Sequence, residues 1–485
     1  MYRTLPVINL LGQLIVLFSL TMVVPALYSF ITRDAALYAY DKAIFVTVIS
    51  GFAMALVSRK HKRELQVRDG FLLVVLAYSV LPVFAALPLL AFLPDLSFTD
   101  AYFEAVSGLT ATGGTVFSGL DQMPASINLW RGELVWLGGM GLIVLAVAIL
   151  PLLGVGGRQL YKAETPGPMK DTKLTPRITE TAKGLWLVYT GLSVACIFAY
   201  RVAGMNWLDA VIHAFTTMGL GGFSSHDASY GYFDSPAIEA VAVTFMLIAG
   251  MNFATHFLAW RGKAFRPYRI DPEARMFLLV TLASCLAVAL FLWLEGIYSD
   301  FPSALRYASF NTVSIATTTG FANTDYNLWP TFVPLWMLFL SSFATCSGST
   351  GGGIKMIRAQ LLVQQVYREM IKLLHPNAVS PVKIGRVLVP TNIIFAVLAF
   401  LSVYGLLIVF LTLLMTASGL DVVTAFSAIV ACINNAGPGL NEVGPAATYA
   451  VLSDFQTWIC TIAMLLGRLE LFTLLIVFTP GFWRK

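Results

Sequence analysis

Charge is scarce in this chain of 485 residues. Only 12% of its residues are charged and 58% are hydrophobic, whereas about 25% of the residues of an average soluble protein are charged. This composition excludes a large soluble domain. The net charge of +5 does not indicate nucleic-acid binding, because the basic residues sort into a few short loops between apolar runs.

Residues that build metal centres and active sites are equally scarce. The five cysteines lie in or beside apolar runs and form no CxxC pair, and the five histidines are scattered. This pattern predicts neither a disulfide framework nor a metal site. A membrane enzyme would need clustered His, Asp or Cys at membrane depth, and the apolar runs contain no such cluster. We therefore expect no enzymatic activity.

Long apolar runs are abundant instead. A bilayer-spanning helix needs roughly 20 apolar residues, and we expect ten spans, near 7–31, 43–58, 70–93, 132–153, 184–203, 237–260, 275–295, 330–365, 391–416 and 454–480. Basic residues concentrate in the loops at 59–68, 158–183, 261–275 and 368–386. The positive-inside rule places these loops and both chain termini in the cytoplasm. The opposite loops are acidic and would concentrate cations at an outer mouth.

Four short segments between spans end alike, in small residues and glycine. The similar ends are Thr110, Ala111, Thr112 and Gly113; Gly219, Leu220, Gly221 and Gly222; Thr317, Thr318, Thr319 and Gly320; and Asn434, Asn435, Ala436 and Gly437. Such backbone lets carbonyl oxygens replace the water shell of a cation. Ordinary extracellular turns are the alternative for any one loop, but four in register predict a pore, with potassium as the leading ion.

Each glycine loop follows a candidate half-helix that enters the membrane from outside. The expected starts, near helix-capping residues, are Asp100, Asp209, Ser303 and Thr424, with Asp421 three residues before the last. About ten residues from such a start cover roughly half a bilayer. The predicted fold is therefore all-α and membrane-embedded. Two N-terminal helices (1–66) precede four span–pore-loop–span repeats, at 67–165, 166–268, 269–385 and 386–485, around a pseudo-fourfold pore.

Several longer stretches resemble a known family. They are Gly138 to Gly141 with the following LIVLAVAILP, Pro166 to Asp171, Gly221 to Asp227, Gly348 to Lys355, Asn434 to Gly439, and Gly467 to Glu470. Together they resemble the TrkH/KtrB/HKT superfamily of cation transport proteins, and within it the bacterial TrkH and TrkG potassium uptake subunits. The resemblance covers essentially the whole chain.

That resemblance implies low-affinity potassium uptake across the bacterial inner membrane, with potassium as the transported ion. It also implies a homodimer and a separate cytosolic nucleotide-binding regulator, similar to TrkA. The filter backbone would be 111–113, 220–222, 318–320 and 435–437. The first loop reads Thr-Ala-Thr-Gly-Gly where the family commonly has Thr-Thr-Thr-Gly-Ala, which leaves backbone coordination possible.

The eighth run is interrupted by small residues. Its break contains Gly348, Ser349, Thr350, Gly351, Gly352 and Gly353 after Cys346 and Ser347. A helix cannot continue stably through so many glycines, and broken helices at mid-membrane form gates and binding sites. A flexible kink is the alternative. The stretch does not match a nucleotide-binding P-loop, because Ile354 separates Gly353 from Lys355 and no strand precedes it.

Arg468 lies inside the last apolar run, where an arginine faces the protein interior by default. We interpret it, mainly from the family resemblance, as an electrostatic barrier to cations that works with the 346–353 break. A salt bridge to Glu470, or a side chain reaching the membrane surface, is the alternative.

Two transport mechanisms remain open on the same scaffold. Proton coupling usually needs a relay of carboxylates within the membrane, and the spans contain few, namely Glu133 and Glu470. This favours gated passive conduction. A proton- or sodium-coupled potassium symporter is the alternative.

Overall fold

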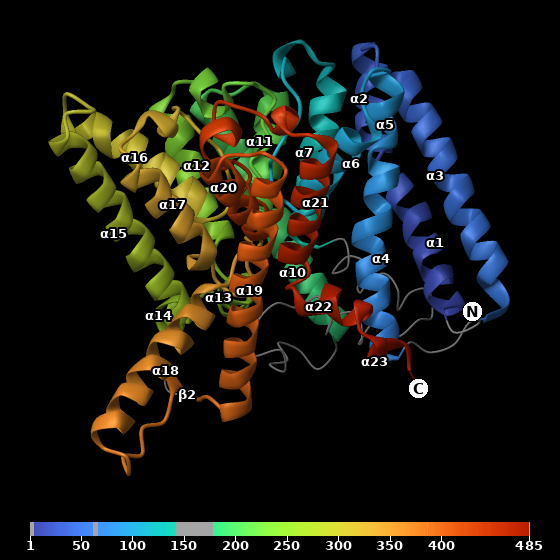
Figure 1. Ribbon diagram of the computed structural model, residues 1–485. Helices are drawn as coiled ribbons and strands as arrows, with labels where there is room; N and C mark the ends of the chain where they lie inside the picture. Colours follow the sequence, from blue (N-terminus) through green and yellow to red (C-terminus); the bar gives the residue numbers. More distant parts are fainter. Residues whose placement is uncertain (1–3, 62–65, 142–177, 386, 485) are drawn as a thin grey trace.

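A computed structural model describes residues 4–61, 66–141, 178–385 and 387–484 (Figure 1). The part described is almost entirely helical. Its sheet is one short antiparallel pair, β1 (Lys383–Ile384) and β2 (Val387–Leu388), with Lys383 opposite Leu388. The predicted all-α membrane fold is therefore confirmed.

Three helices precede the repeated part of the chain. They are α1 (Leu5–Ser19), α2 (Val23–Thr32) and α3 (Leu37–Ser58), followed by the turn η1 (Arg59–His61). The helices α1 and α2 together form one apolar stretch long enough to cross a membrane, and α3 forms the next. These correspond to the first two predicted spans.

The order of span, half-helix and second helix then recurs four times. The first set is α4 (Val67–Ala85), α5 (Leu87–Phe92), α6 (Phe98–Leu109), η2 (Leu120–Gln122) and α7 (Ala125–Gly139). The second is α10 (Ile178–Ala203), α11 (Trp207–Gly219), η4 (Ser229–Tyr232), α12 (Pro236–Ala249), α13 (Phe253–Gly262) and α14 (Arg266–Ile270). The third is α15 (Pro272–Leu294), α16 (Phe301–Ala316), η5 (Tyr326–Leu328), α17 (Phe332–Phe343) and α18 (Met356–Leu374). The fourth is α19 (Thr391–Ala417), α20 (Val422–Asn434), η6 (Asn441–Val443), η7 (Tyr449–Val451), α21 (Asp454–Arg468), α22 (Phe472–Leu475), η8 (Ile476–Phe478) and α23 (Pro480–Trp483).

The half-helices α6, α11 and α16 begin one turn earlier than the sequence suggested, and α20 is capped by Asp421, the residue noted three positions before its predicted start. Their caps are Ser97, Asn206, Asp300 and Asp421, whose side-chain oxygens accept the N–H of Asp100, Asp209, Ser303 and Thr424 respectively. The predicted starts are thus the residues whose N–H groups the caps bind. The error came from assuming about ten residues per half-helix, whereas the four contain 12 to 16.

Two predicted spans bend sharply where the sequence suggested a straight helix. The run 237–260 bends by 93° between α12 and α13, and the run 454–480 bends by 106° between α21 and the segment Phe472–Phe478. Asn252 caps α13, while Glu470 and Leu471, just after α21, have positive φ angles of 52° and 51° that turn the chain. Hydropathy does not reveal either bend, because the apolar composition continues through it. The fourth predicted span is described only as far as residue 141, so the rest of 132–153 lies outside the described residues.

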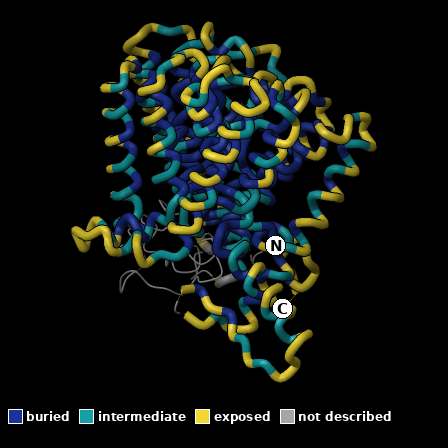
Figure 2. Tube along the Cα trace, turned by 90° about the vertical axis from the view of Figure 1, so that its left-hand side faces the viewer, coloured by how far each residue is buried: buried dark blue, intermediate teal, exposed yellow. Residues whose placement is uncertain are grey.

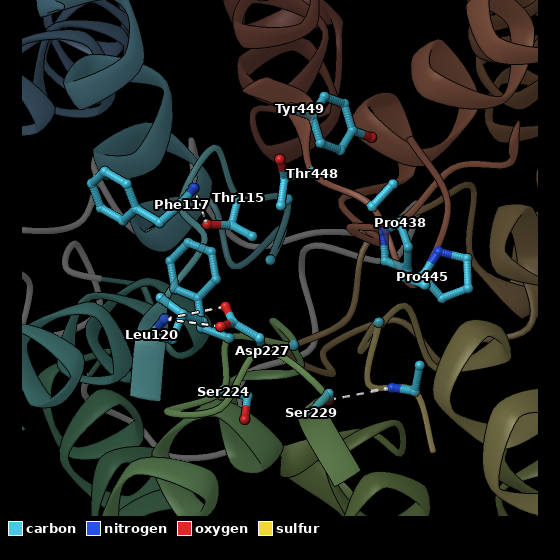
Figure 3. A pocket seen from close by; sticks show the side chains of 18 of the residues that line it. Thr115, Phe117, Leu120, Ser224, Asp227, Ser229, Pro438, Pro445, Thr448 and Tyr449 are labelled. Atoms are coloured by element: carbon cyan, nitrogen blue, oxygen red, sulfur yellow. Dashed lines mark hydrogen bonds between the residues drawn. The ribbon is translucent and has the colours of Figure 1, made fainter. Parts of the chain in front are cut away.

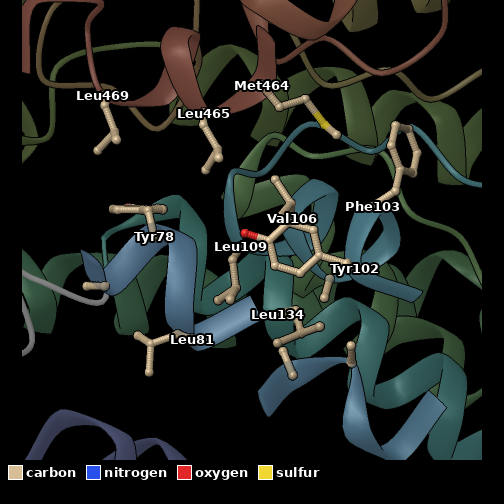
Figure 4. Packing of buried hydrophobic residues seen from close by; sticks show 14 of the residues in the cluster. Tyr78, Leu81, Tyr102, Phe103, Val106, Leu109, Leu134, Met464, Leu465 and Leu469 are labelled. Carbon is tan, nitrogen blue, oxygen red and sulfur yellow. The ribbon is translucent and has the colours of Figure 1, made fainter. Parts of the chain in front are cut away.

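The repeats pack in a closed cycle. The second helix of each repeat contacts the half-helix of the next: α7 packs on α11, α12 on α16, α17 on α20, and α21 on α6. Figure 4 shows the last of these contacts, where Leu465 of α21 faces Val106 and Leu109 of α6. Four half-helices held in this way surround one axis.

Burial follows from this arrangement. Buried backbone concentrates at the centre of the upper part of the molecule in Figure 2, while exposed residues follow the periphery. Outward-facing residues of spans such as α15 are still apolar, for example Leu279 and Leu286, as expected for a surface in contact with lipid. The two chain ends lie low in Figure 1, on the same side as α18 and β2.

Candidate functional site

The four glycine loops meet each other at the end of the half-helices. A Cβ atom added to any of the four glycines would lie closer than 3 Å to the carbonyl oxygen of a residue in the next loop: Gly113 to Gly221, Gly222 to Thr319, Gly320 to Ala436, and Gly437 to Thr112. The contacts run once around the cycle and close on themselves. The structure therefore brings all the predicted filter residues together in one ring, which we call the glycine ring (residues 111–113, 220–222, 318–320 and 435–437).

Each of the four loops enters the ring through the same kind of backbone turn at the end of its half-helix. Ala111, Leu220, Thr318 and Asn435 have φ angles of 52°, 54°, 60° and 54°, in the left-handed region that ends a helix. The N–H of the following residue donates to the carbonyl five residues back, as Thr112 does to Ser107 at 2.8 Å and Ala436 to Ala431 at 2.8 Å. This is the pattern of a Schellman motif. It binds the last helical carbonyls and turns the next carbonyls away from the helix.

Most of the carbonyl oxygens that contact the four glycines accept no hydrogen bond from the part of the chain that the structure describes. Among the described residues, the oxygens of Thr112, Thr319 and Ala436 accept no hydrogen bond, while that of Gly221 accepts the N–H of Phe223 at 2.6 Å. Buried carbonyl groups without a partner are costly, so a ring of them is suited to bind a cation. The second loop makes the ring only pseudo-fourfold.

Side chains behind the ring follow a twofold pattern. Thr110 and Thr112 pair their hydroxyls at 2.7 Å, and Thr317 and Thr319 do the same at 2.7 Å. The second and fourth loops have no such pair. Instead, Asn435 Nδ2 donates to Thr112 Oγ1 at 2.9 Å and ties the fourth loop to the first. Opposite repeats are thus more alike than adjacent ones.

A buried ion pair supports the outer side of the ring. Arg131 of α7 and Glu104 of α6 are each 1% exposed, and Arg131 Nε lies 2.8 Å from Glu104 Oε1. Arg131 also donates to the carbonyl of Ser224 at 3.1 Å, and Glu104 accepts the N–H of Val116 at 3.0 Å. The pair therefore joins the backbone that leaves the first glycine loop to that which leaves the second. Sequence reasoning made no claim for Glu104 and missed Arg131, since nothing in the spacing of the two residues indicates that they meet.

An outer pocket opens above the ring (Figure 3). It is lined by residues of the segments that follow the glycines, among them Thr115, Asp227, Ser229 and Tyr449. Tyr449 Oη donates to the carbonyl of Gly437 at 2.8 Å, so the pocket wall is tied directly to the ring. Gly113, Gly222 and Gly320 of the glycine ring also line this pocket.

Several acidic residues on the outer side of the ring hold the outer loops in place through hydrogen bonds. Asp227 accepts the N–H groups of Gly119 and Leu120 at 3.0 and 3.2 Å. His226 lies between Asp121 and Asp209. Burial lowers the pKa of His226, but hydrogen bonds and charge attraction from these two carboxylates outweigh it and raise the pKa above its usual value. These carboxylates therefore organise the loops as well as contributing negative potential.

A non-helical loop lies on the other side of the ring. It connects α17 to α18 and covers residues 344–355, four residues more than the predicted break; we call it the 344–355 loop. Gly352 N donates to Thr318 Oγ1 at 2.8 Å, and Thr350 Oγ1 donates to the carbonyl of Met218 at 2.9 Å. A Cβ on Gly352 would overlap the carbonyl oxygen of Asn434. The loop thus packs against the ends of three half-helices.

The remaining predicted residues of the break hold the loop together or anchor it. The carbonyl of Gly348 accepts the N–H of Phe253 at 2.9 Å, and Ser349 Oγ donates to the carbonyl of Cys346 at 2.6 Å. Gly351 accepts a hydrogen bond from the buried Lys355 Nζ. Gly353 has a φ of 77°, a conformation that favours glycine.

Arg468 joins this loop to the first repeat. Its Nη1 donates to the carbonyl of Thr350 at 3.0 Å, and its Nη2 donates to the carbonyls of Gly138 and Gly139, the latter at 2.9 Å. The structure therefore brings Arg468 and the 344–355 loop together. With the half-helix contacts, the loop and the arginine reach all four repeats beneath the ring.

Glu470 does not pair with Arg468. Glu470 Oε2 instead lies 2.9 Å from Arg358 Nη2, in the first turn of α18. The alternative of an Arg468–Glu470 salt bridge is therefore wrong, because the backbone reverses at Glu470 and Leu471 and directs the carboxylate towards α18.

Comparison with known proteins identifies relatives along the whole chain. The family model described as "TrkH: Cation transport protein" matches residues 39–485. The "Trk system potassium uptake protein TrkH" of Halomonas elongata is 50% identical and that of Escherichia coli K12 is 47% identical, over 99% and 98% of this chain and 99% of each relative. The crystal structure of the potassium transporter TrkH from Vibrio parahaemolyticus superimposes with a TM-score of 0.90 at 45% identity, covering 99% of this chain and 100% of that one.

The geometry of the ring predicts the effect of enlarging its glycines. Replacing Gly222 or Gly320 by Ala places a methyl group against the carbonyl of the next loop, and the ring must widen or twist. We expect potassium flux in liposomes to fall, or discrimination against sodium to drop on the order of tenfold, which needs a change of only about 1.4 kcal/mol in relative ion binding.

A matched control for this change is Gly191→Ala in α10, where an added Cβ meets nothing within 4 Å. The control should keep the parent's flux and selectivity. Unchanged selectivity in both ring variants would show that these four segments are ordinary loops.

Proposed function

Because the chain belongs to the TrkH family of cation transport proteins, we propose that potassium ions cross the membrane through the glycine ring. The observation that carries this proposal is the closed cycle of glycine-to-carbonyl contacts, which leaves backbone oxygens around one opening. Carbonyl oxygens can replace the water shell of a potassium ion that enters from the outer pocket. The protein is a potassium transporter and not an enzyme.

The chain is organised around this pathway as follows. Residues 1–66 stand outside the pore, and the four repeats, at 67–165, 166–268, 269–385 and 386–485, each contribute one wall. The half-helices point their C-terminal ends, which carry partial negative charge, towards the ring. Residues 110–113, 220–222, 318–320 and 435–437 bind the ion by their backbone.

The mechanism we favour is passive conduction. Of the two carboxylates that the sequence offered for coupling, Glu470 pairs with Arg358, and Glu133 of α7 makes no hydrogen bond to a ring residue in the described part of the chain. We expect the reversal potential of the purified protein in liposomes to follow the potassium gradient alone. A shift of the reversal potential with the proton or sodium gradient would favour the symporter alternative.

The 344–355 loop and Arg468 form the gate in this proposal. The loop blocks the path sterically beneath the ring, and the positive charge of Arg468 repels cations there. Glycine-rich backbone can move aside more easily than a packed helix. An outer filter and an inner gate are therefore separate structures.

Changes to the gate should raise flux without altering selectivity. We expect Arg468→Ala, or deletion within Gly348–Gly353, to increase potassium flux in liposomes, by about tenfold for each ~1.4 kcal/mol taken from the barrier. The ring is untouched, so sodium should still be excluded. Arg201→Ala is the control, since Arg201 binds the carbonyl of Met205 near the end of α10.

Two results would contradict this assignment. If both variants fold and conduct no better than the parent, the gate lies elsewhere. If flux rises but sodium passes equally well, the ring is not a separate filter.

The membrane placement follows from charge. Basic loops at 59–68, 261–275 and 368–386, together with both termini, would face the cytoplasm of the bacterial inner membrane. The termini lie on the same side of the molecule as α18 (Figure 1), which supports this orientation.

The helix α18 offers the gate a connection to a partner. It starts directly after the 344–355 loop and presents Arg368 and Lys372 near its far end. We infer that a cytosolic nucleotide-binding regulator, similar to TrkA, docks on the basic cytoplasmic surface of a homodimer of this chain and moves α18. The isolated chain should bind neither ATP nor NAD in a calorimetric titration. Tight binding of either would contradict the proposal that a separate regulator binds the nucleotide.

A further inference from the structure

Glu273 is a buried carboxylate outside the ring, the loop and the arginine already described. It lies in the first turn of α15 and is 4% exposed. Nothing in the sequence singles it out, because a glutamate at a helix start usually complements the helix dipole. In the structure, Glu273 instead binds backbone N–H groups of another segment of the chain.

One oxygen of Glu273 binds both sides of the 344–355 loop. Glu273 Oε1 accepts the N–H of Ser347 at 2.7 Å and the N–H of Ile357 at 3.0 Å. Ser347 lies near the start of the loop, while Ile357 belongs to the first turn of α18. Two backbone segments ten residues apart are thus fixed to a single atom on a third element.

The loop has other attachments, through Thr318, Met218 and Arg468, but Glu273 joins its start to the first turn of α18. Within the loop, Lys355 Nζ donates to the carbonyl of Gly351, and Thr345 Oγ1 donates to that of Gly352 at 2.7 Å. The N–H of Met356 donates to Thr345 at 2.8 Å. These bonds keep the loop compact, but they lie within the chain segment and do not attach it to α15.

We propose that Glu273 is the latch that holds the 344–355 loop in its blocking position beneath the glycine ring. A shift of α18 away from α15 would withdraw the Ile357 N–H from the shared oxygen and weaken the hold on Ser347 at the same time. Glu273 is therefore a positioning residue, which acts on the ion path through the loop. This inference rests on the proposed gate.

The acceptor oxygen, rather than the size of the side chain, is what the latch requires. Glu273→Leu has a similar size and no acceptor, so it should release the loop. Glu273→Gln keeps an oxygen at the same position and should hold it. A residue needed only for packing would give the opposite order, because leucine packs in an apolar setting at least as well as glutamine.

The experiment measures potassium flux in liposomes and labelling of Cys346 for Glu273→Leu and Glu273→Gln. Cys346 is buried at the start of the loop, so a water-soluble thiol reagent reports loop release independently of ion flow. We expect Glu273→Leu to raise flux by about tenfold, the effect of losing one to two hydrogen bonds, and to increase Cys346 labelling. Glu273→Gln should resemble the parent in both measurements.

The matched control is Glu239→Leu. Glu239 is likewise 4% exposed and lies in the first turn of a helix, but it binds Arg306, far from the loop. It should leave flux and labelling unchanged. Cys346→Ser in the Glu273→Leu background identifies the labelled thiol among the five cysteines.

The outcomes distinguish a failure of the role proposed for Glu273 from a failure of the proposed gate. If Arg468→Ala conducts more than the parent but Glu273→Leu changes neither flux nor labelling, the latch is wrong and the gate stands. If neither variant conducts more, the proposed gate itself is wrong. Should Glu273→Leu not fold, Glu273→Asp shortens the reach to both N–H groups by one methylene. Parent-like flux and labelling in that variant would also overturn the latch.

Discussion

The structure depends on one steric constraint, the absence of room for a Cβ atom at four points around an axis. At each of Gly113, Gly222, Gly320 and Gly437, the backbone of one loop lies against a carbonyl of the next. Only glycine permits that approach. Three features hold the four backbones in this contact: the left-handed residue that begins each segment of the ring, the closed packing cycle of half-helices and second helices, and the buried Glu104–Arg131 pair.

Irregular backbone within a membrane creates a second demand, because no water is present to bind its polar groups. The half-helices meet this demand through their terminal turns, and the loops behind them through hydroxyl and amide side chains such as Thr112 and Asn435. The 344–355 loop meets it with Thr318, Thr345 and Glu273. Opening of the proposed gate would have to exchange these hydrogen bonds for others.

Much of the fold could be predicted from the sequence, because its signals are local. Apolar runs indicated the spans, and four similar glycine loops indicated four walls of one pore. The break before α18 was equally visible as a run of glycines. Cap positions were missed by one turn, since Ser97 and Asp100 are both good caps and only the length of the half-helix distinguishes them. The bends at 250–252 and 469–471 were missed because a bent apolar run has the same hydropathy as a straight one.

The residues that sequence reasoning missed are those whose roles depend on distant partners. Arg131 and Glu104 are 27 residues apart, and Glu273 binds residues 74 and 84 positions away. A single sequence contains no signal for such pairs. A buried charge is a useful hint, but it does not name its partner. Arg468 was recognised as important, yet the carbonyls it binds became evident only from the structure.

The most direct test is to locate the ion. A crystal of the protein soaked in a rubidium or thallium salt would reveal a potassium-like ion by its anomalous scattering. We predict a peak on the pseudo-fourfold axis, within coordination distance of the carbonyl oxygens of Thr112, Gly221, Thr319 and Ala436. An ordered ion bound elsewhere in the membrane-embedded part, with none at the glycine ring, would contradict the central claim.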